Sequence, residues 1–408
     1  MINLREAGRI LYVSSVDISV GNGPGVNERE FVVALDRAIG DRAHFLIPRP
    51  VDEVPEIPLD RCSFSLPHQE HSYVRYPAHV LSQMKTADRI LSRDHFDLLV
   101  FRLDLLPFAP LYITSRHNIP YALKTVGQGL LNTLGEKGGL LGKPLMEMNR
   151  QLVRRLVAKS LVADSVSKAQ VAFLQDVLKL DSEKIEWIDN AVNTDRFFPS
   201  STTEARERLG LAKFSPIVGY VGTRPWERGG MQLVETAPEL LARYPHLGLV
   251  ILGDGDALDS LERKARELQV DEHCVFAGYV PFPEVPHYVN SLDVGVSISL
   301  RSDRFAASEL KVRQYLACGK PVVVSPGSND FLATEKLGST VQPTDLKALA
   351  VELEHWFSIE GDERARFENR AMGYISENLS MEAAINRRLD LWSERLRSLQ
   401  LRHSSSQA

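Results

Sequence analysis

The stretch SISLRSDRFAASELKVRQYLACGKPVVVSPG, residues 297–327, contains the pattern that decides the fold. An apolar strand ends at its start, a polar loop follows, and a helix is expected to begin near Ser308 and to lead into a second apolar strand after Pro321. A strand, a helix and a second strand in this order form the βαβ unit of a parallel sheet. The segment therefore predicts an α/β fold.

The same alternation of short apolar strands and longer amphipathic segments continues in both directions along the chain. In the second half, we expect strands in PIVGYVGT, LGLVILGDGD, CVFAGYVP, LDVGVSISL, KPVVVSPG and STVQPTD. In the first half, we expect them over 9–15, 44–48, 97–102, 121–126, 161–164 and 185–188. Two such series predict two facing, Rossmann-like, doubly wound parallel-sheet domains, with a ligand in an interdomain cleft at the carboxyl ends of the strands.

The turn-rich segment DNAVNTDRFFPSSTTEA, residues 189–205, separates the two series. Its Asn, Asp, Pro and Ser residues are typical of a linker. We therefore place an N-terminal domain, expected on the acceptor side, at residues 1–190 and a C-terminal, nucleotide-binding domain at 191–375. A final helix is expected over 376–400, and a disordered tail over 401–408.

Composition narrows the class of protein. The 408 residues, 44% hydrophobic and 25% charged, are enough for two domains with their own cores. A net charge of −5 produces no positive field that would attract nucleic acid. Three widely spaced cysteines indicate a reducing compartment, and no apolar run is long enough to span a bilayer. We expect a cytoplasmic protein without a nucleic-acid partner.

One segment is compatible with peripheral contact of the protein with the inner membrane face. KPLMEMNRQLVRRLVAKS, residues 143–160, alternates apolar and basic positions. Such a helix suits either an anionic lipid surface or solvent, and general frequencies favour solvent. A lipid-linked acceptor would reverse that preference.

Two basic clusters follow strands of the second series. The first lies in GYVGTRPWERGG, where the strand ends at Gly222 and Arg224 and Arg228 offer guanidinium groups suited to phosphate. The second is the helix expected near Ser308, whose N-terminus favours a diphosphate and whose Lys311 adds a positive charge. Either cluster alone is better explained by an ordinary crossover or surface loop with solvated side chains. Two clusters at strand ends of one sheet favour a phosphate site.

Weaker signals come from three other loops. In LGDGD, Gly253 and Asp254 indicate a tight turn or a close approach to a ligand. The backbone of Tyr279 and Val280 is placed to contact a nucleobase edge, although a rigid turn explains it equally well. In the first domain, Gly23 and Gly25 are interpreted as part of a flexible loop, with Asn27 and Glu28 opening the next helix. His68, Glu70 and His71 are interpreted as solvated residues and not as metal ligands.

These residues, in this order, resemble the retaining glycosyltransferase family 4, also called glycosyl transferases group 1, which has the GT-B fold. IDNAVNTDRFFPS is similar to the segment that joins the two domains in that family, YVGTRPWERGG to its donor loop, and LACGKPVVVS to the start of a later strand. The match runs from about Ile188 to Gly327. The first domain resembles the family in layout only.

The resemblance implies a metal-independent retaining glycosyltransferase that moves a sugar from a UDP- or GDP-sugar to an acceptor hydroxyl. Arg228 and Lys311 would neutralise the departing diphosphate. The backbone amides of Ser308, Glu309 and Leu310 would bind the diphosphate, and the Gln314 side chain would bind the ribose. The further donor-binding candidates are Gly222, Arg224, Gly253, Asp254, Tyr279, Val280, Gly23 and Gly25. No cofactor is implied beyond the donor, and Mg²⁺ is not required.

The resemblance also implies a carbohydrate, a lipid-linked molecule or a small molecule as the acceptor, in polysaccharide or glycoconjugate synthesis. The chain departs from the family pattern at four places. Ala306 stands where the family has the first glutamate of a pair, and Gln314 where it has the second. Thr223 stands at the usual loop Arg position, with Arg224 one step later, and Gly127 with Gln128 replaces a His-Gly pair. These departures motivate an alternative, a non-catalytic GT-B subunit that binds a sugar nucleotide or a partner enzyme.

Overall fold

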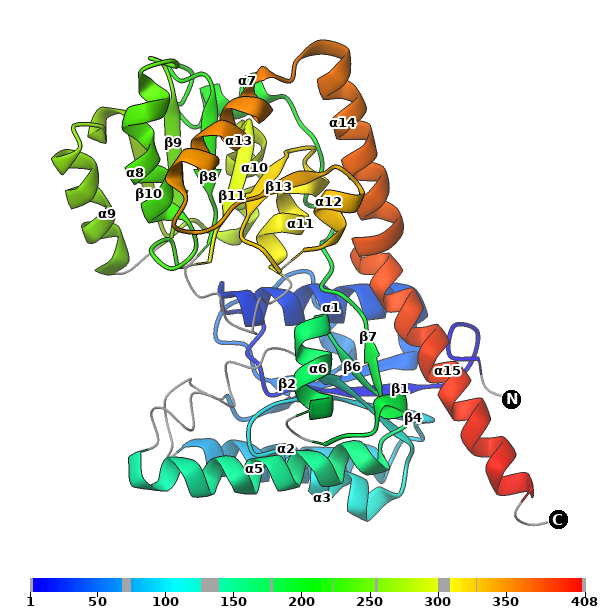
Figure 1. The fold of residues 1–408 in the computed structure, drawn as a ribbon. Helices are drawn as coiled ribbons and strands as arrows, with labels where there is room; N and C mark the ends of the chain where they lie inside the picture. Colours follow the sequence, from blue (N-terminus) through cyan, green and yellow to red (C-terminus); the bar gives the residue numbers. More distant parts are fainter. Residues whose placement is uncertain are drawn as a thin grey trace. The chain divides into compact units, whose positions relative to one another are not determined.

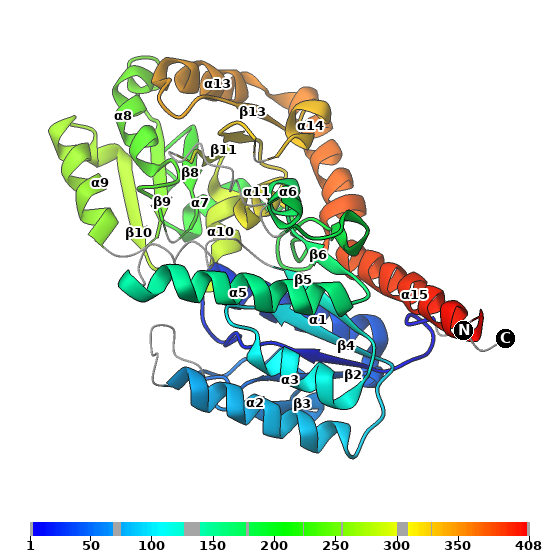
Figure 2. The ribbon, with the colours of Figure 1, turned by 60° about the horizontal axis from the view of Figure 1, so that its bottom comes forward.

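The computed structural model describes residues 3–67, 75–125, 139–176, 179–222, 224–253, 256–299, 309–327 and 329–405. The chain divides into two compact units. The first unit comprises Met1–Asp189 together with Met381–Ala408, and the second comprises Asn190–Ser380. The chain therefore leaves the first unit once and returns to it with its last helix. Figures 1 and 2 show a helix-covered sheet in each unit.

The first unit is built on a seven-stranded parallel sheet with the order β3-β2-β1-β4-β5-β6-β7. The strands are β1 (Ile10–Val13), β2 (Ala43–Pro48), β3 (Cys62–Ser65), β4 (Leu98–Leu103), β5 (Tyr121–Thr125), β6 (Ala163–Ser165) and β7 (Ile185–Trp187). The helices are α1 (Gly23–Ile39), α2 (Arg75–Leu91), α3 (Phe108–His117), α5 (Gly139–Lys159), α6 (Lys168–Asp176) and α15 (Met381–Ser405), with 3₁₀ turns η1 (Gly40–Arg42), η2 (Leu59–Arg61) and η3 (Ser182–Lys184).

All six strands predicted in this half are present. The sequence pattern missed β3, because this short strand at the sheet edge is only partly buried and has the polar sequence CSFS. The tail predicted from residue 401 is also helical as far as Ser405, since α15 continues to that residue.

Alternate residues of β1 show why helices cover both faces of the first sheet. Ile10 and Tyr12 pack in one core with residues of α1 and α15, while Leu11 and Val13 pack in another with residues of α2, α3 and α5. Side chains of a strand point to opposite faces in turn, so a strand buried on both faces is apolar throughout. Figure 1 shows α1 on one face of the sheet and α2, α3 and α5 on the other.

The second unit is built on a six-stranded parallel sheet with the order β10-β9-β8-β11-β12-β13. The strands are β8 (Ile217–Tyr220), β9 (Gly248–Leu252), β10 (Cys274–Gly278), β11 (Val294–Ser297), β12 (Val322–Val324) and β13 (Gly338–Thr340). The helices are α7 (Thr202–Arg208), α8 (Gly230–Leu241), α9 (Asp256–Glu267), α10 (Val285–Ser291), α11 (Leu310–Ala317), α12 (Phe331–Thr334), α13 (Leu346–Ser358) and α14 (Gly361–Tyr374). Shorter turns are η4 (Asp271–His273), η5 (Phe282–Glu284) and the π-helical η6 (Ile375–Leu379).

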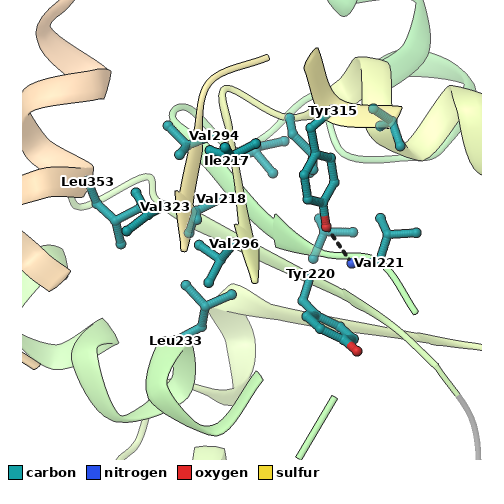
Figure 3. Close-up of a cluster of buried hydrophobic side chains, with 14 of the residues drawn as sticks. Ile217, Val218, Tyr220, Val221, Leu233, Val294, Val296, Tyr315, Val323 and Leu353 are labelled. Atoms are coloured by element: carbon teal, nitrogen blue, oxygen red, sulfur yellow. Dashed lines mark hydrogen bonds between the residues drawn. The ribbon is translucent and has the colours of Figure 1, made fainter. Parts of the chain in front are cut away.

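The core of the second unit gathers around β8 and β11, and all six predicted strands are confirmed. Figure 3 shows β-branched side chains of both strands, among them Val218 and Val296, with Leu233 of α8 and Leu353 of α13. Tyr315 of α11 joins this core, and its hydroxyl accepts a hydrogen bond of 2.8 Å from the Val221 N–H. That bond ties α11 to the end of β8.

The strand order places a topological switch point between β8 and β11. From β8 the chain builds outward through β9 to β10, and from β11 it builds outward on the other side through β12 to β13. Open parallel sheets bind their ligands at such a point, beyond the carboxyl ends of the strands. Both basic clusters predicted from the sequence follow these two strands.

Candidate functional site

The loop from β8 to α8 is held against the end of β11 by its backbone. The Ile298 N–H donates a hydrogen bond of 3.0 Å to the carbonyl oxygen of Arg228. A Cβ added to Gly229, which has a φ of +117°, would lie 3.0 Å from Cγ1 of Val296 and 3.1 Å from the Ile298 nitrogen. Only glycine combines this φ with such a close approach. The loop therefore carries Arg228 to the second of the two predicted clusters.

Arg228 and Glu309 form the ion pair that joins the two clusters. One carboxylate oxygen of Glu309 accepts a hydrogen bond from Arg228 Nη1, and the other accepts one from the Ser297 hydroxyl at the end of β11. The side chain of Glu309 is 10% exposed and that of Arg228 is 26% exposed. The sequence predicted only a backbone role for Glu309, so its side chain is a feature that the structure adds.

Lys311 occupies the other flank of β8. Its Nζ donates a hydrogen bond of 2.8 Å to the Tyr220 hydroxyl and lies 3.9 Å from the centroid of the same ring. A Cβ on Gly222, with a φ of +148°, would lie 2.9 Å from that Nζ. In the part of the chain that the structure describes, Lys311 forms no ion pair. Among the described residues, its ammonium is thus stabilised by a neutral hydroxyl and a ring face.

Helix α11 begins at Leu310, so the helix predicted from near Ser308 is present. Glu309 is its N-cap residue but makes no capping hydrogen bond with its side chain, which reaches Arg228 instead. Ser308 lies outside the described residues. Gln314 is 9% exposed and, among the described residues, its side chain has no hydrogen bond. Ribose binding by Gln314 stays a prediction.

The ends of β9 and β10 adjoin the end of β8. The Gly253 N–H donates a hydrogen bond of 3.0 Å to the Gly278 carbonyl oxygen, and a Cβ on Gly253 would lie 2.5 Å from the Gly222 carbonyl oxygen. Tyr279 is 59% exposed and Val280 packs partly against the core. Asp254 lies outside the described residues. A base-binding role for Tyr279 and Val280 stays a prediction.

Arg224 is the most exposed of the predicted phosphate ligands. Its side chain is 69% exposed, and its guanidinium lies 3.5 Å from the carboxylate of Glu227 in the same loop. The structure thus brings Arg228, Lys311 and Glu309 together around β8 and β11, while Arg224 has a separate surface partner. An exposed pair of this kind contributes little by itself.

In the first unit, the predicted flexible glycine loop is wrong. Helix α1 begins at Gly23, so Gly23 and Gly25 lie in its first turn, and the helix does not open at Asn27. The reason is local, because the Asn22 side chain accepts a hydrogen bond of 2.9 Å from the Gly25 N–H and caps the helix. A Cβ on Gly25 would lie 2.3 Å from the Val20 carbonyl oxygen. Donor binding by these glycines stays a prediction.

A buried charge cluster at the strand ends of the first sheet was not predicted. The Glu28 carboxylate accepts hydrogen bonds of 2.6 Å from Arg102 and 2.5 Å from Lys124, and another from the Tyr12 hydroxyl. Burial acts to raise the pKa of Glu28, but Lys124 and Arg102 outweigh it and hold that pKa near 2. Burial holds the pKa of Lys124 at about 8. The signal that could have revealed the cluster is a charged residue one position before the end of each strand, Lys124 in β5 and Arg102 in β4.

Several expectations fall on residues that the structure leaves undescribed. These are His68, Glu70, His71, Gly127, Gln128 and Ala306. In the described ranges, no three His, Cys, Asp or Glu side chains form a group that could hold a metal ion. The helices described here include none that is long and apolar enough to cross a bilayer. Metal independence and a cytoplasmic location stay predictions.

Comparison with known sequences finds a family match within the second unit. It matches the glycosyl transferases group 1. The family model covers residues 215–358, which run from the start of β8 to the end of α13. The resemblance inferred from the motifs is therefore confirmed at the level of this family, while the narrower family 4 assignment is consistent with it.

One curated relative is the GDP-mannose-dependent alpha-(1-6)-phosphatidylinositol monomannoside mannosyltransferase of Mycolicibacterium smegmatis. It is 34% identical over 176 residues, which are 41% of this chain and 46% of the relative. The chain thus spans about half the length of that relative in the match. Sequence similarity of this extent supports the family for the matched part and leaves the activity of the whole protein to be tested.

Solved structures match the fold along nearly the whole chain. Sucrose-phosphate synthase from Thermosynechococcus elongatus has a TM-score of 0.71 at 17% identity and covers 96% of this chain and 100% of its own. Anabaena HepE, solved in complex with UDP, has a TM-score of 0.70 at 15% identity and covers 95% and 100%. The fold is GT-B, as the motifs implied.

Proposed function

We propose that the protein is a retaining glycosyltransferase that moves a sugar from a nucleotide-diphosphate sugar to an acceptor hydroxyl. The observation that carries the proposal is the convergence of Arg228 and Lys311 on the ends of β8 and β11. Two cations and the N-terminus of α11 at a topological switch point form an environment suited to a diphosphate. The family match over the same residues supports the same assignment.

The chemistry follows from where charge develops. As the bond between the anomeric carbon and the diphosphate oxygen breaks, negative charge grows on the diphosphate, and Arg228 and Lys311 stabilise it. The acceptor hydroxyl attacks from the face that the diphosphate leaves and passes its proton to the departing phosphate oxygen. No dedicated base is required in this scheme, and no metal takes part, although Mg²⁺ can accompany the nucleotide.

The donor is proposed to be a UDP- or GDP-sugar that carries a hexose or a related sugar. The M. smegmatis relative is named as GDP-mannose-dependent, and the HepE structure contains UDP. The acceptor is proposed to be a carbohydrate, a lipid-linked molecule or a small molecule in glycoconjugate or polysaccharide synthesis. A lipid-linked acceptor fits α5, whose exposed residues include Lys143, Arg155 and Lys159. Such a protein would act in the cytoplasm at the inner membrane face.

The alternative is a GT-B subunit that binds a sugar nucleotide without turning it over. Gln314 favours it, because an amide stands where the family carries a glutamate and cannot supply a negative charge. The two functions share donor binding and differ only in catalysis.

The test is a two-stage assay of the purified chain. Nucleoside diphosphates (UDP, GDP and ADP) are first ranked by the increase in melting temperature that each produces. The sugar nucleotides of the best base are then incubated with an acceptor panel, and the anomeric configuration of any product is determined by NMR. Retention of configuration is expected. Binding without transfer across the panel would favour the alternative. The absence of binding would refute both the transferase and the subunit that binds a sugar nucleotide.

A further inference from the structure

The carboxylate of Glu309 lies where a phosphate ligand of Arg228 is expected. It is nearly buried, it pairs with Arg228, and the Ser297 hydroxyl holds its second oxygen. An N-cap residue normally uses its side chain on the first turn of its own helix, yet that of Glu309 does not. Arg228, in the loop that follows β8, and Ser297, the last residue of β11, therefore hold this carboxylate in a specific place.

The charges of the site are mismatched to a diphosphate in this arrangement. Glu309 neutralises Arg228, and Lys311 is left as the cation without an ion pair in the described part of the site. A nucleoside diphosphate carries more than one negative charge at neutral pH. A phosphate oxygen that approached Arg228 would also meet the like charge of Glu309, and this repulsion is strong where water is partly excluded.

We propose that Glu309 is a resident counter-anion for Arg228, which leaves this guanidinium when a diphosphate binds. The inference rests on the proposed function, because it places the donor diphosphate at Arg228. In the empty site the carboxylate keeps a half-buried guanidinium paired, which avoids the cost of an uncompensated charge. In the occupied site the diphosphate takes over that role. Binding then exchanges one anion for another and favours ligands with enough charge to displace Glu309.

The experiment compares Glu309→Gln with the wild-type chain by isothermal titration calorimetry with UDP, GDP and ADP. Glutamine keeps the shape of the side chain but removes the competing charge. The variant is expected to bind the preferred nucleoside diphosphate about three- to tenfold more tightly, the effect of removing one nearby like charge at a partly hydrated site. The nucleoside without phosphates should bind both proteins equally.

Glu354→Gln is the matched control. Glu354 also pairs with an arginine, Arg243, and is 19% exposed, but it lies on α13 and pairs with a residue beyond the far end of α8. The Glu354→Gln substitution changes the net charge by the same amount as Glu309→Gln and should leave the affinity for the nucleoside diphosphate unchanged. Ser297→Ala is a second variant that loosens the hold on Glu309 without removing its charge, and it should tighten binding by a smaller factor.

Equal or weaker diphosphate binding by Glu309→Gln, with normal binding by the wild type, would overturn the inference and leave the proposed function standing. A gain of equal size in Glu354→Gln would also overturn it, since the effect would then be one of net charge. If neither the wild type nor any variant bound a nucleoside diphosphate, the proposed function would fail, and the inference with it.

Discussion

Arg228 is the single residue on which the proposed chemistry depends most. Its guanidinium can meet two phosphate oxygens in a fixed geometry, which a lysine cannot do. Its backbone is anchored by the Ile298 N–H, so truncation of the side chain should not displace the loop.

We expect Arg228→Ala to lower kcat/KM for the sugar nucleotide by about a hundredfold, because a charge that stabilises the departing diphosphate is lost. The kcat/KM of Arg228→Lys should lie between that of Arg228→Ala and that of the wild type. The measurement is initial-rate kinetics with the best donor and acceptor, with Arg243→Ala as the control, since its 59% exposed guanidinium pairs with Glu354 away from the switch point. An unchanged rate would exclude Arg228 from the site.

Glu28 is the residue whose loss should most affect the stability of the first unit. It is fully buried and pairs with both Arg102 and Lys124. Glu28→Gln keeps the shape but removes the carboxylate from buried Lys124 and leaves Arg102 with its ion pair to Asp104 at 3.2 Å. The loss of this buried charge should lower the free energy of unfolding by about 3–5 kcal/mol. Urea denaturation at pH 7 measures the loss, and a change below about 1 kcal/mol would contradict this account.

The Glu28 carboxylate should also make the stability of the protein fall at acid pH. Its folded pKa of about 2 is below its ordinary value of 4.5, so the folded state holds the deprotonated form more strongly than the unfolded chain does. The contribution is complete above pH 4.5 and is lost as the pH falls towards 2. The stability difference between the wild type and Glu28→Gln should therefore shrink over that range.

At the scale of elements, the position of α11 decides where Glu309, Lys311 and Gln314 lie. Tyr315 sets that position, because its hydroxyl accepts the Val221 N–H and its ring lies against Gly295. A Cβ on Gly295 would come within 2.4 Å of the ring. The glycine thus permits the close approach of α11 to β11.

We expect Tyr315→Phe to lower the free energy of unfolding by about 1–3 kcal/mol, because the buried Val221 N–H loses its acceptor. Nucleotide affinity should fall as well, since α11 carries three proposed ligands of the donor. Chemical denaturation and calorimetry measure the two effects. Tyr288→Phe is the control, because among the described residues the Tyr288 hydroxyl forms no hydrogen bond. Equal losses in both variants would count against the role given to the hydroxyl.

At the scale of the whole molecule, the proposed donor ligands and the last helix belong to different units. Arg228, Glu309, Lys311 and Gln314 all lie in residues 190–380. The two ends of that unit adjoin, since the Val192 N–H donates a hydrogen bond of 2.9 Å to the Leu379 carbonyl oxygen. Helix α15 instead packs on the first unit, where Trp392 is fully buried and Arg388 pairs with Asp164 at 2.8 Å.

The fragment 190–380 is therefore expected to fold alone and to bind the preferred nucleoside diphosphate with a Kd within about threefold of the full chain, since it keeps its own core and its proposed ligands. It should transfer no sugar, because the acceptor is expected on the first unit. Circular dichroism and calorimetry test the fragment. A folded fragment that failed to bind, beside a full chain that bound, would show that the first unit supplies donor contacts.

Local patterns in the sequence were sufficient for most of the fold. Apolar runs bounded by turns predicted all strands except β3, and the order of strands and helices predicted parallel sheets, because these signals act over a few neighbouring residues. The start of α1 was misplaced, since capping by Asn22 outweighed the apparent loop composition. The end of α15 was also misplaced: the helix continues to Ser405 although Leu401 is exposed.

The sequence by itself also determined which loops carry the basic residues of the candidate site, because glycines and arginines that follow an apolar strand can be recognised from the local sequence. Only the tertiary structure decided which charges meet. Arg228 and Glu309 are 81 residues apart, and Glu28 is separated by 74 residues from Arg102 and 96 from Lys124. The physical reason is that such pairs form through the order and register of strands in a sheet, which bring distant strand ends to one edge, and no local pattern encodes the partner of a charged side chain.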